Sequence, residues 1–420
     1  RNLPVAALSA MTGFTFDVLH ALESGARTGL LRTANGQIST PGMLMYTRRG
    51  SPQHLTSDTL EAMRSQGLPC ALQVNAADFL KSYPKVKEVG GGVSRFSLGG
   101  AWAAMMGYRD PATFGLDFKP GHDTGMYVHS GDHGVKLLTP ALYMDIVDAL
   151  EPDMFVALSD EVSFAAKNPV KRARQSGERT REWLRACRTR ASESGRAMFA
   201  AVQGGSVAAE RTRLAAELAT EEGVAGFALG GFGSGESSLE MQTELMRASV
   251  VPLPSLKPRF VSGLASPLEM ISAVECGVDL FDGALTHAAT LRGVALVFPL
   301  EPGSADAEWR LRLSDPALAR DRRPLREGCS CSTCTAHTRA YLHHLVLGKE
   351  MLAEALLEQH NAHHLEEFFA AMRKAVERDN LEAFRSFHRK GHEEAERKEL
   401  EAERAEAFNA EQAANDRARF

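Results

Sequence analysis

From Thr139 onward the sequence alternates between segments with the pattern of a buried strand and segments with the pattern of a helix. The expected strands are 154–158, 197–202, 226–229, 259–262 and a short one around 280–281, and the expected helices are 140–150, 170–196, 207–222, 236–248 and 267–276. Such alternation favours a parallel sheet covered by helices, and at least five rounds favour a closed eightfold barrel over an open sheet. The sequence therefore predicts an α/β fold of the TIM (β/α)8 barrel type.

Polar or glycine residues follow the expected strands. They are Asp160, Gln203, Gly230, Gly263 and Asp282. Because a TIM barrel carries its binding residues after the carboxyl ends of its strands, all five are expected to face one mouth. Asp160 could accept hydrogen bonds from the amidine edge of a purine-like base, or it could cap the next helix. Gln203 offers donors and acceptors, and Gly230 lets a planar ligand approach the backbone closely.

Asp282 ends the expected strand and is the candidate nucleophile. Glycosyl transfer passes through an oxocarbenium-like state, which a carboxylate can trap as a covalent sugar intermediate. Such a mechanism also needs an acid or a base that faces the nucleophile. The segment 128–134, which contains His129 and Asp132, is where we expect to find that group.

Three closely spaced cysteines, Cys329, Cys331 and Cys334, are followed by a run of helix formers that reaches His360. Thiolates separated by one and two residues can turn toward the same point, and an imidazole completes the tetrahedron that structural zinc prefers. We therefore predict one structural zinc ion in a zinc-binding subdomain. Other histidines that could supply the fourth ligand are His337, His343, His344, His363 and His364.

The composition limits the function classes. A formal net charge of −5 does not favour a broad nucleic-acid surface, so any RNA contact would use a local basic patch. Six cysteines are too few for a disulfide scaffold and favour a reducing compartment. No apolar run reaches the roughly 18 residues of a membrane span. We expect a cytoplasmic location, with the nucleus or the outer surface of mitochondria as alternatives.

Four regions are expected along the chain. They are the barrel core (1–300), a linker or insertion (301–328), the zinc-binding subdomain with its closing helices (329–378) and a charged helical extension (379–420). Within the first region, residues 88–125 are rich in glycine and weakly patterned. They are expected to form a long surface loop or an insertion.

Several of these motifs together resemble those of the queuine tRNA-ribosyltransferases, also called tRNA-guanine transglycosylases. The matching segments are 128–131, 158–161, 202–204, 229–232, 277–282, 329–334, 339–345 and 360–361. The likeness extends from about residue 25 to residue 369. It implies a TIM barrel with an inserted zinc subdomain, and exchange of the wobble guanine of tRNAs with GUN anticodons for queuine or a precursor.

The resemblance also implies roles for single residues. The zinc ligands would be Cys329, Cys331, Cys334 and His360. The residues that hold the base would be Asp160, Gln203 and Gly230, and the nucleophile would be Asp282. A hypothesis that follows is that the pocket of this chain still holds a queuine-like base without exchanging it.

Two departures from the family pattern argue against catalysis by this chain. Catalytic members carry Asp-Ser-Gly-Gly where we align His129-Ser130-Gly131-Asp132, so that His129 replaces the general-base aspartate. They also carry Pro-Thr-Arg where this chain has Leu285-Thr286-His287. A histidine can nevertheless act as a base at neutral pH.

The segment 41–56 is similar to the non-catalytic subunit of the eukaryotic heterodimer. The leading expectation is therefore an accessory subunit that helps to bind tRNA and stabilises a catalytic partner. One alternative is a self-sufficient transglycosylase with Asp282 as nucleophile and His129 or Asp132 as the proton-transfer group. Another is a scaffold or RNA-binding protein that no longer uses the pocket.

Overall fold

Eight parallel strands close into a barrel in the order β10-β11-β12-β13-β4-β5-β6-β9. The computed structural model describes residues 13–68, 71–113, 121–130, 134–164, 166–233, 238–301 and 308–394. The barrel strands are β4 (Gly42–Tyr46), β5 (Leu72–Asn75), β6 (Ala104–Gly107), β9 (Met154–Val156), β10 (Ala197–Val202), β11 (Gly226–Leu229), β12 (Arg259–Val261) and β13 (Leu280–Asp282). Pairing of Asp282 with Leu44 joins the last strand to the first. The predicted TIM barrel is confirmed.

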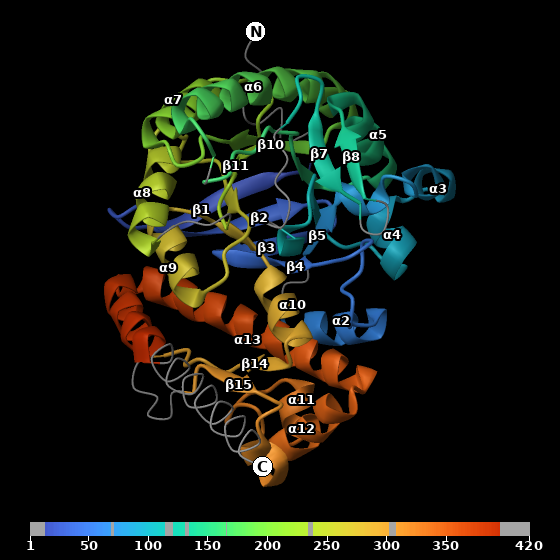
Figure 1. Cartoon of the computed structure of the whole chain (residues 1–420), viewed down its shortest axis with the longest axis vertical. Coiled ribbons are helices and arrows are strands. Elements are labelled where there is room, and N and C mark those ends of the chain that lie inside the picture. Colours follow the sequence, from blue (N-terminus) through green and yellow to red (C-terminus); the bar gives the residue numbers. More distant parts are fainter. Residues whose placement is uncertain are drawn as a thin grey trace, which may run out of the picture.

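Helices follow the strands and cover the outside of the barrel (Figure 1). They are α2 (Ser57–Ser65), α3 (Tyr83–Val89), α4 (Gly92–Leu98), α5 (Pro140–Leu150), α6 (Pro169–Ser194), α7 (Ala208–Ala219), α8 (Leu239–Val250), α9 (Pro267–Glu275) and α10 (Ala284–Leu291), with the short 3₁₀ turns η1 (Ala76–Phe79) and η2 (Pro111–Thr113). The start of α5 is set locally, because the Thr139 hydroxyl accepts a hydrogen bond from the Leu142 N–H and Pro140 occupies the first turn. None of the described helices combines the length and apolar composition needed to cross a membrane.

Two smaller sheets are attached to the barrel. The first is antiparallel and consists of β1 (Thr15–Ala21), β2 (Arg27–Thr33) and β3 (Gly36–Thr40). A buried ion pair between Arg27 and Asp279, 2.7 Å long, ties β2 to the residue just before β13, so this sheet lies at the amino-terminal end of the strands. The second is a hairpin of β7 (Met126–His129) and β8 (Val135–Leu138), which precedes α5.

One prediction was wrong. Residues 88–125, expected to be a loop or an insertion, contain α4 and the third barrel strand β6. The strand consists of Ala104, Met105, Met106 and Gly107, which have none of the β-branched residues that make a strand recognisable. It pairs with β5 along one edge and with β9 along the other, so these long-range hydrogen bonds determine its conformation.

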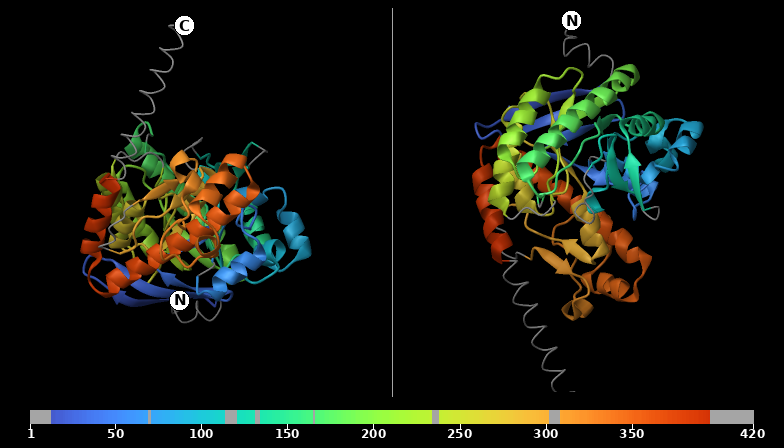
Figure 2. Two further views of the ribbon diagram at one scale, coloured as in Figure 1. Left: turned by 90° about the horizontal axis from the view of Figure 1, so that it is seen from below. Right: turned by 45° about the horizontal axis from the view of Figure 1, so that its top comes forward.

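The subdomain that carries the cysteine group lies at one end of the molecule, and its long helix α13 also packs along the barrel (Figure 1). Its elements are β14 (Val294–Leu296), β15 (Arg310–Arg312), η4 (Pro316–Arg320), α11 (Ser332–Ala336), α12 (Arg339–Gly348) and α13 (Met351–Glu377). The right-hand view of Figure 2 shows most of these elements, in orange, below the barrel. The segment 301–328, expected to be a linker or an insertion, contributes to this subdomain, since β15 pairs with β14 and Leu313, Leu318 and Leu325 share an apolar cluster with the cysteines.

Residues 381–394 are helical and form the described part of the expected charged extension. One face of this helix is buried, and it consists of Leu381, Phe384 and His388. The Phe384 and His388 rings are 5.8 Å and 5.2 Å from the ring of Phe368 on α13. The extension from residue 395 to 420 lies outside the described residues.

Candidate functional site

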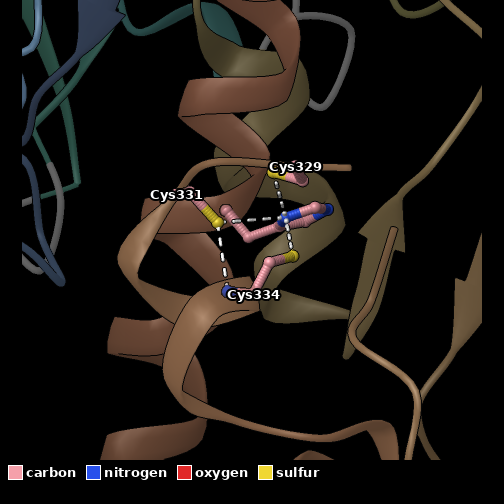
Figure 3. A group of neighbouring side chains, drawn as sticks. Cys329, Cys331 and Cys334 are labelled. Carbon is pink, nitrogen blue, oxygen red and sulfur yellow. Dashed lines mark hydrogen bonds between the residues drawn. The ribbon is translucent and has the colours of Figure 1, made fainter. Parts of the chain in front are cut away.

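Four buried side chains, Cys329, Cys331, Cys334 and His360, converge in the subdomain (Figure 3). The three sulfur atoms lie 3.9, 3.5 and 3.3 Å, in that order, from Nδ1 of His360. These distances place all four ligand atoms around one point, and the donor set is that of a structural zinc site. The group can hold a metal ion with no further ligand from solvent.

Local structure orients each ligand. The Cys331 sulfur accepts a hydrogen bond from the Cys334 N–H at 3.3 Å and thereby caps α11. In the middle of α13, His360 has its Nε2 2.9 Å from the carbonyl oxygen of Leu296. Donation of the Nε2 proton to that carbonyl leaves Nδ1 as the ligand atom, which is the usual outer-shell arrangement of a metal-bound histidine. Contact with Cys331 and Cys334 lowers the pKa of the Cys329 thiol and so favours a thiolate in the group.

The other candidate histidines do not belong to this four-ligand group. His364 is buried and its ring stacks on that of His360, with the ring centroids 5.9 Å apart. His343 is hydrogen bonded to the Leu313 carbonyl oxygen at 2.7 Å, and His337 stacks on Tyr341. His344 is exposed. His363 reaches Ser330 and Glu367, and it could form only a smaller group with Cys329 and Glu367. Of the histidines considered from the sequence, His360 is therefore the one that completes the group of three cysteines.

At the mouth of the barrel, the carboxylate of Asp160 is fully buried and saturated by partners from this chain. Arg172 of α6 forms a two-pronged ion pair with it, with N–O distances of 2.7 and 2.5 Å. Arg179, about two helical turns further along α6, donates to the same carboxylate at 3.1 Å, and the Gly121 N–H does so at 3.1 Å. A carboxylate accepts about four hydrogen bonds, so Asp160 has little capacity left for a ligand.

Gln203 and Gly230 lie together, as expected of residues that follow neighbouring strands. The Gln203 amide donates to the Ser159 hydroxyl at 2.8 Å. A side chain at position 230 would place its Cβ 2.0 Å from that amide nitrogen, so any larger residue there would have to displace the Gln203 amide. The Gly230 carbonyl oxygen accepts hydrogen bonds from the buried guanidinium of Arg211 at 3.1 and 3.2 Å.

Asp282 is also held by the backbone. Its two oxygens accept hydrogen bonds from the Gly263 N–H at 2.6 Å and from the Ala284 N–H at 2.8 Å, the latter at the start of α10. Burial raises the pKa of Asp282, these two hydrogen bonds act in the opposite direction, and the nearby charge of Asp110 adds to the rise. Asp110 accepts a hydrogen bond from the Tyr46 hydroxyl at 2.9 Å.

The structure does not place His129 among the residues that follow the barrel strands. It is exposed at the end of β7, in the hairpin, and Asp132 lies outside the described residues. The acid near Asp282 is instead Asp110, which comes after β6. Sequence reasoning missed Asp110 because β6 was not recognised. The signal that could have found it is the polar run Arg109-Asp110, which follows the short apolar segment 104–106.

A pocket opens at the mouth beside these residues. Those that line it include Gln73, Tyr108, Arg109, Glu161, Gly230 and Phe232. Glu161 forms an ion pair of 2.9 Å with Arg109 and accepts a hydrogen bond from the Tyr108 hydroxyl at 3.1 Å. Burial raises the pKa of Glu161, and the charge of Arg109 opposes this rise. Asp160, Gln203 and Asp282 are not among the described residues that line this pocket.

His287, which stands at the place of the arginine in the family pattern, presents no cation. It is buried and stacks between two rings, 4.6 Å from Tyr46 and 5.7 Å from His54. Burial lowers the pKa of His287 to about 4, so the ring is neutral at physiological pH. A neutral, stacked imidazole cannot replace a guanidinium in binding a phosphate.

Comparison with known proteins agrees with this geometry. The family model described as queuine tRNA-ribosyltransferase matches residues 22–394. A protein of Gallus gallus named queuine tRNA-ribosyltransferase accessory subunit 2 is 32% identical over 397 residues, which cover 85% of this chain and 92% of the relative. The proteins of the same name from Danio rerio and Homo sapiens are 32% and 31% identical, with 88% and 87% of this chain and 96% and 95% of the relative covered.

Proposed function

This chain belongs to the queuine tRNA-ribosyltransferase family, and we propose that it is the accessory subunit of a heterodimer whose other subunit carries out base exchange. The observation that carries the proposal is the state of Asp160 and Asp282. Asp160 is saturated by two arginines, and both oxygens of Asp282 accept backbone hydrogen bonds. Neither carboxylate is among the described residues that line the pocket at the mouth, which supports a role without catalysis.

The metal of the subdomain is, in this proposal, one zinc ion with a structural role. A donor set of three buried thiol groups and one imidazole favours zinc, whereas magnesium and calcium prefer oxygen ligands. Because the chain supplies all four ligands, no position is left for a water molecule that could take part in a reaction. The ion would fasten the cysteine turn to α13 and so support the faces on which a partner could bind.

A contribution to tRNA binding is supported by exposed basic side chains near the carboxyl ends of the strands. Arg48 and Arg49 follow β4, and Lys171 and Arg174 lie in the first two turns of α6. Such side chains bind phosphates without reading a base. In this proposal they supply the local positive charge that a chain of net charge −5 needs in order to contact RNA.

A reducing compartment, the cytoplasm, is the location that we propose. Five cysteines of the described residues are free and buried, and three of them must stay reduced to bind a metal ion. Cell fractionation with the catalytic subunit as a marker tests this location, and recovery of the chain in an oxidising compartment would contradict it.

The test of the function is exchange of labelled guanine into tRNA that carries a guanine at the wobble position. The assay is run with this chain alone, with the catalytic subunit alone and with the mixture. An accessory subunit gives no exchange by itself and raises the exchange of the mixture above that of the catalytic subunit. Exchange by this chain alone would overturn the proposal.

A second candidate is a self-sufficient transglycosylase, favoured by the presence of Asp110 close enough to Asp282 to affect its pKa. In that case Asp282 is the nucleophile and Asp110 is an acid or base beside it. Trapping of a covalent adduct between Asp282 and tRNA would establish this function. An adduct that forms only on the partner would exclude it.

A further inference from the structure

The charge pair around Asp160 has the geometry of a base-recognition contact. A guanidinium that faces a carboxylate with two parallel N–H groups presents the same donor pattern as the amidine edge of a guanine-like base. Arg172 binds Asp160 in this manner, with one nitrogen on each oxygen at 2.7 and 2.5 Å. We propose that Arg172 takes the place of a base edge against Asp160 and, together with Arg179, closes this site to free bases.

Arg179 also contacts a second segment, the one around Gly121. Its Nη1 donates to the Gly121 carbonyl oxygen at 2.8 Å, and its Nε donates to Asp123 at 3.0 Å. Gly121 in turn lies directly over the carboxylate, since a Cβ built on it would be 2.4 Å from Oδ1 of Asp160. Arg179 therefore holds a piece of backbone over Asp160, and Arg172 fills the side that remains.

The helix is fastened to the loop after β9 by further contacts, which keep both arginines in place. The Thr180 hydroxyl accepts a hydrogen bond from the Asp160 N–H at 3.1 Å, and the Ser176 hydroxyl donates to the Asp160 carbonyl oxygen. Positions 172, 176, 179 and 180 lie on one face of the helix because they are three, four, seven or eight residues apart, except for the adjacent pair 179 and 180. The face of α6 that packs on the barrel is thus built around Asp160.

A base that entered this site would have to displace a guanidinium from a buried carboxylate. Arg172 and Arg179 would each lose their ion pair with Asp160 in that exchange. The amidine edge of a guanine-like base is uncharged, so it would not replace the lost ion pairs. The internal pair is also favoured by proximity, because both partners belong to the same chain. The inference deepens the proposed function, on which it rests for taking Asp160 as the base-binding carboxylate of the family, and it implies that base recognition is left to the partner subunit.

The experiment is calorimetric titration of the full chain with queuine, without tRNA and without a partner. The test variant is Arg172→Met with Arg179→Met, which keeps the apolar stems and removes both guanidinium groups. The matched control is Arg185→Met with Arg188→Met, which removes two guanidinium groups of the same helix that pair with Glu221. A third variant adds Asp160→Ala to the test variant.

We expect the test variant to bind queuine at least tenfold more tightly than the unchanged chain and the control, and the added Asp160→Ala to abolish that gain. A folded test variant that binds queuine no more tightly than the unchanged chain would overturn the proposal. If the test variant does not unfold cooperatively, Arg172→Met alone is judged by the same criterion. Since no exchange reaction is measured, failure here is distinguishable from failure of the accessory role.

Discussion

Asp282→Ala separates a structural role of this residue from a catalytic one. The carboxylate is 3% exposed and accepts the Gly263 and Ala284 N–H groups at 2.6 and 2.8 Å. Leaving a buried N–H without an acceptor costs about 1–3 kcal/mol, so the loss of both acceptors should lower the free energy of unfolding by about 2–6 kcal/mol. Unfolding entropy near 2.1 cal/mol/K per residue gives about 0.9 kcal/mol/K for this chain, so the expected fall in Tm is about 2–7 °C.

Asp282→Asn is the matched variant, because the amide keeps one oxygen as acceptor and only one of the two N–H groups loses its partner. We expect about half the fall in Tm, measured by differential scanning calorimetry on the same preparation. Both variants should leave base exchange by the mixture with the catalytic subunit unchanged at a temperature where they are folded. An unchanged Tm for Asp282→Ala, or loss of exchange in folded Asp282→Asn, would refute the reasoning.

Three further predictions concern the subdomain, a buried acid and the basic patch. Cys331→Ala should lose the zinc, measured by atomic emission, and lower both Tm and dimer formation, since Cys331 packs in the apolar cluster of the subdomain; loss of zinc with both retained would contradict a structural role. Burial raises the pKa of Glu366 to about 7 from its usual 4.5, so its contribution to stability is present below about pH 4.5 and is lost as the pH rises to 7. Urea denaturation should therefore show Glu366→Gln gaining on the order of 3 kcal/mol relative to the unchanged chain between pH 4.5 and pH 8, and a constant difference would refute this. Lys171→Ala with Arg174→Ala should weaken tRNA binding by the heterodimer and reduce the slope of log affinity against log salt by about 2, whereas an unchanged slope would exclude this patch.

The barrel and the metal ligands could be predicted because their signals are local. Each of β10 and β11 is an apolar run followed by a polar or glycine residue, and the spacing of the three cysteines alone brings their sulfurs together. The choice of His360 over its neighbours had to come from the family resemblance. The structure adds the physical reason, which is that the Leu296 carbonyl oxygen orients its ring.

The arrangement of the mouth could not be predicted, because it depends on packing between distant segments. The motif around His129 resembles a catalytic motif by its letters, yet it belongs to a hairpin outside the barrel strands. Only the order of the strands shows that Asp110 follows the third of them. Likewise, nothing in the sequence around Asp160 indicates that Arg172 and Arg179 turn back onto it, since this requires the docking of α6 against the loop after β9.

Helix α13 couples the metal-binding group to the barrel mechanically. It is a rod of 27 residues, about 40 Å long, that carries His360 in its first half. In its second half Arg373 donates to the Pro41 carbonyl oxygen at 2.7 Å, next to the first barrel strand. One helix therefore joins the imidazole of the metal-binding group to the edge of the first barrel strand. A displacement of α13 at the barrel would move His360 relative to the three cysteines, although the described barrel strands supply none of these four side chains.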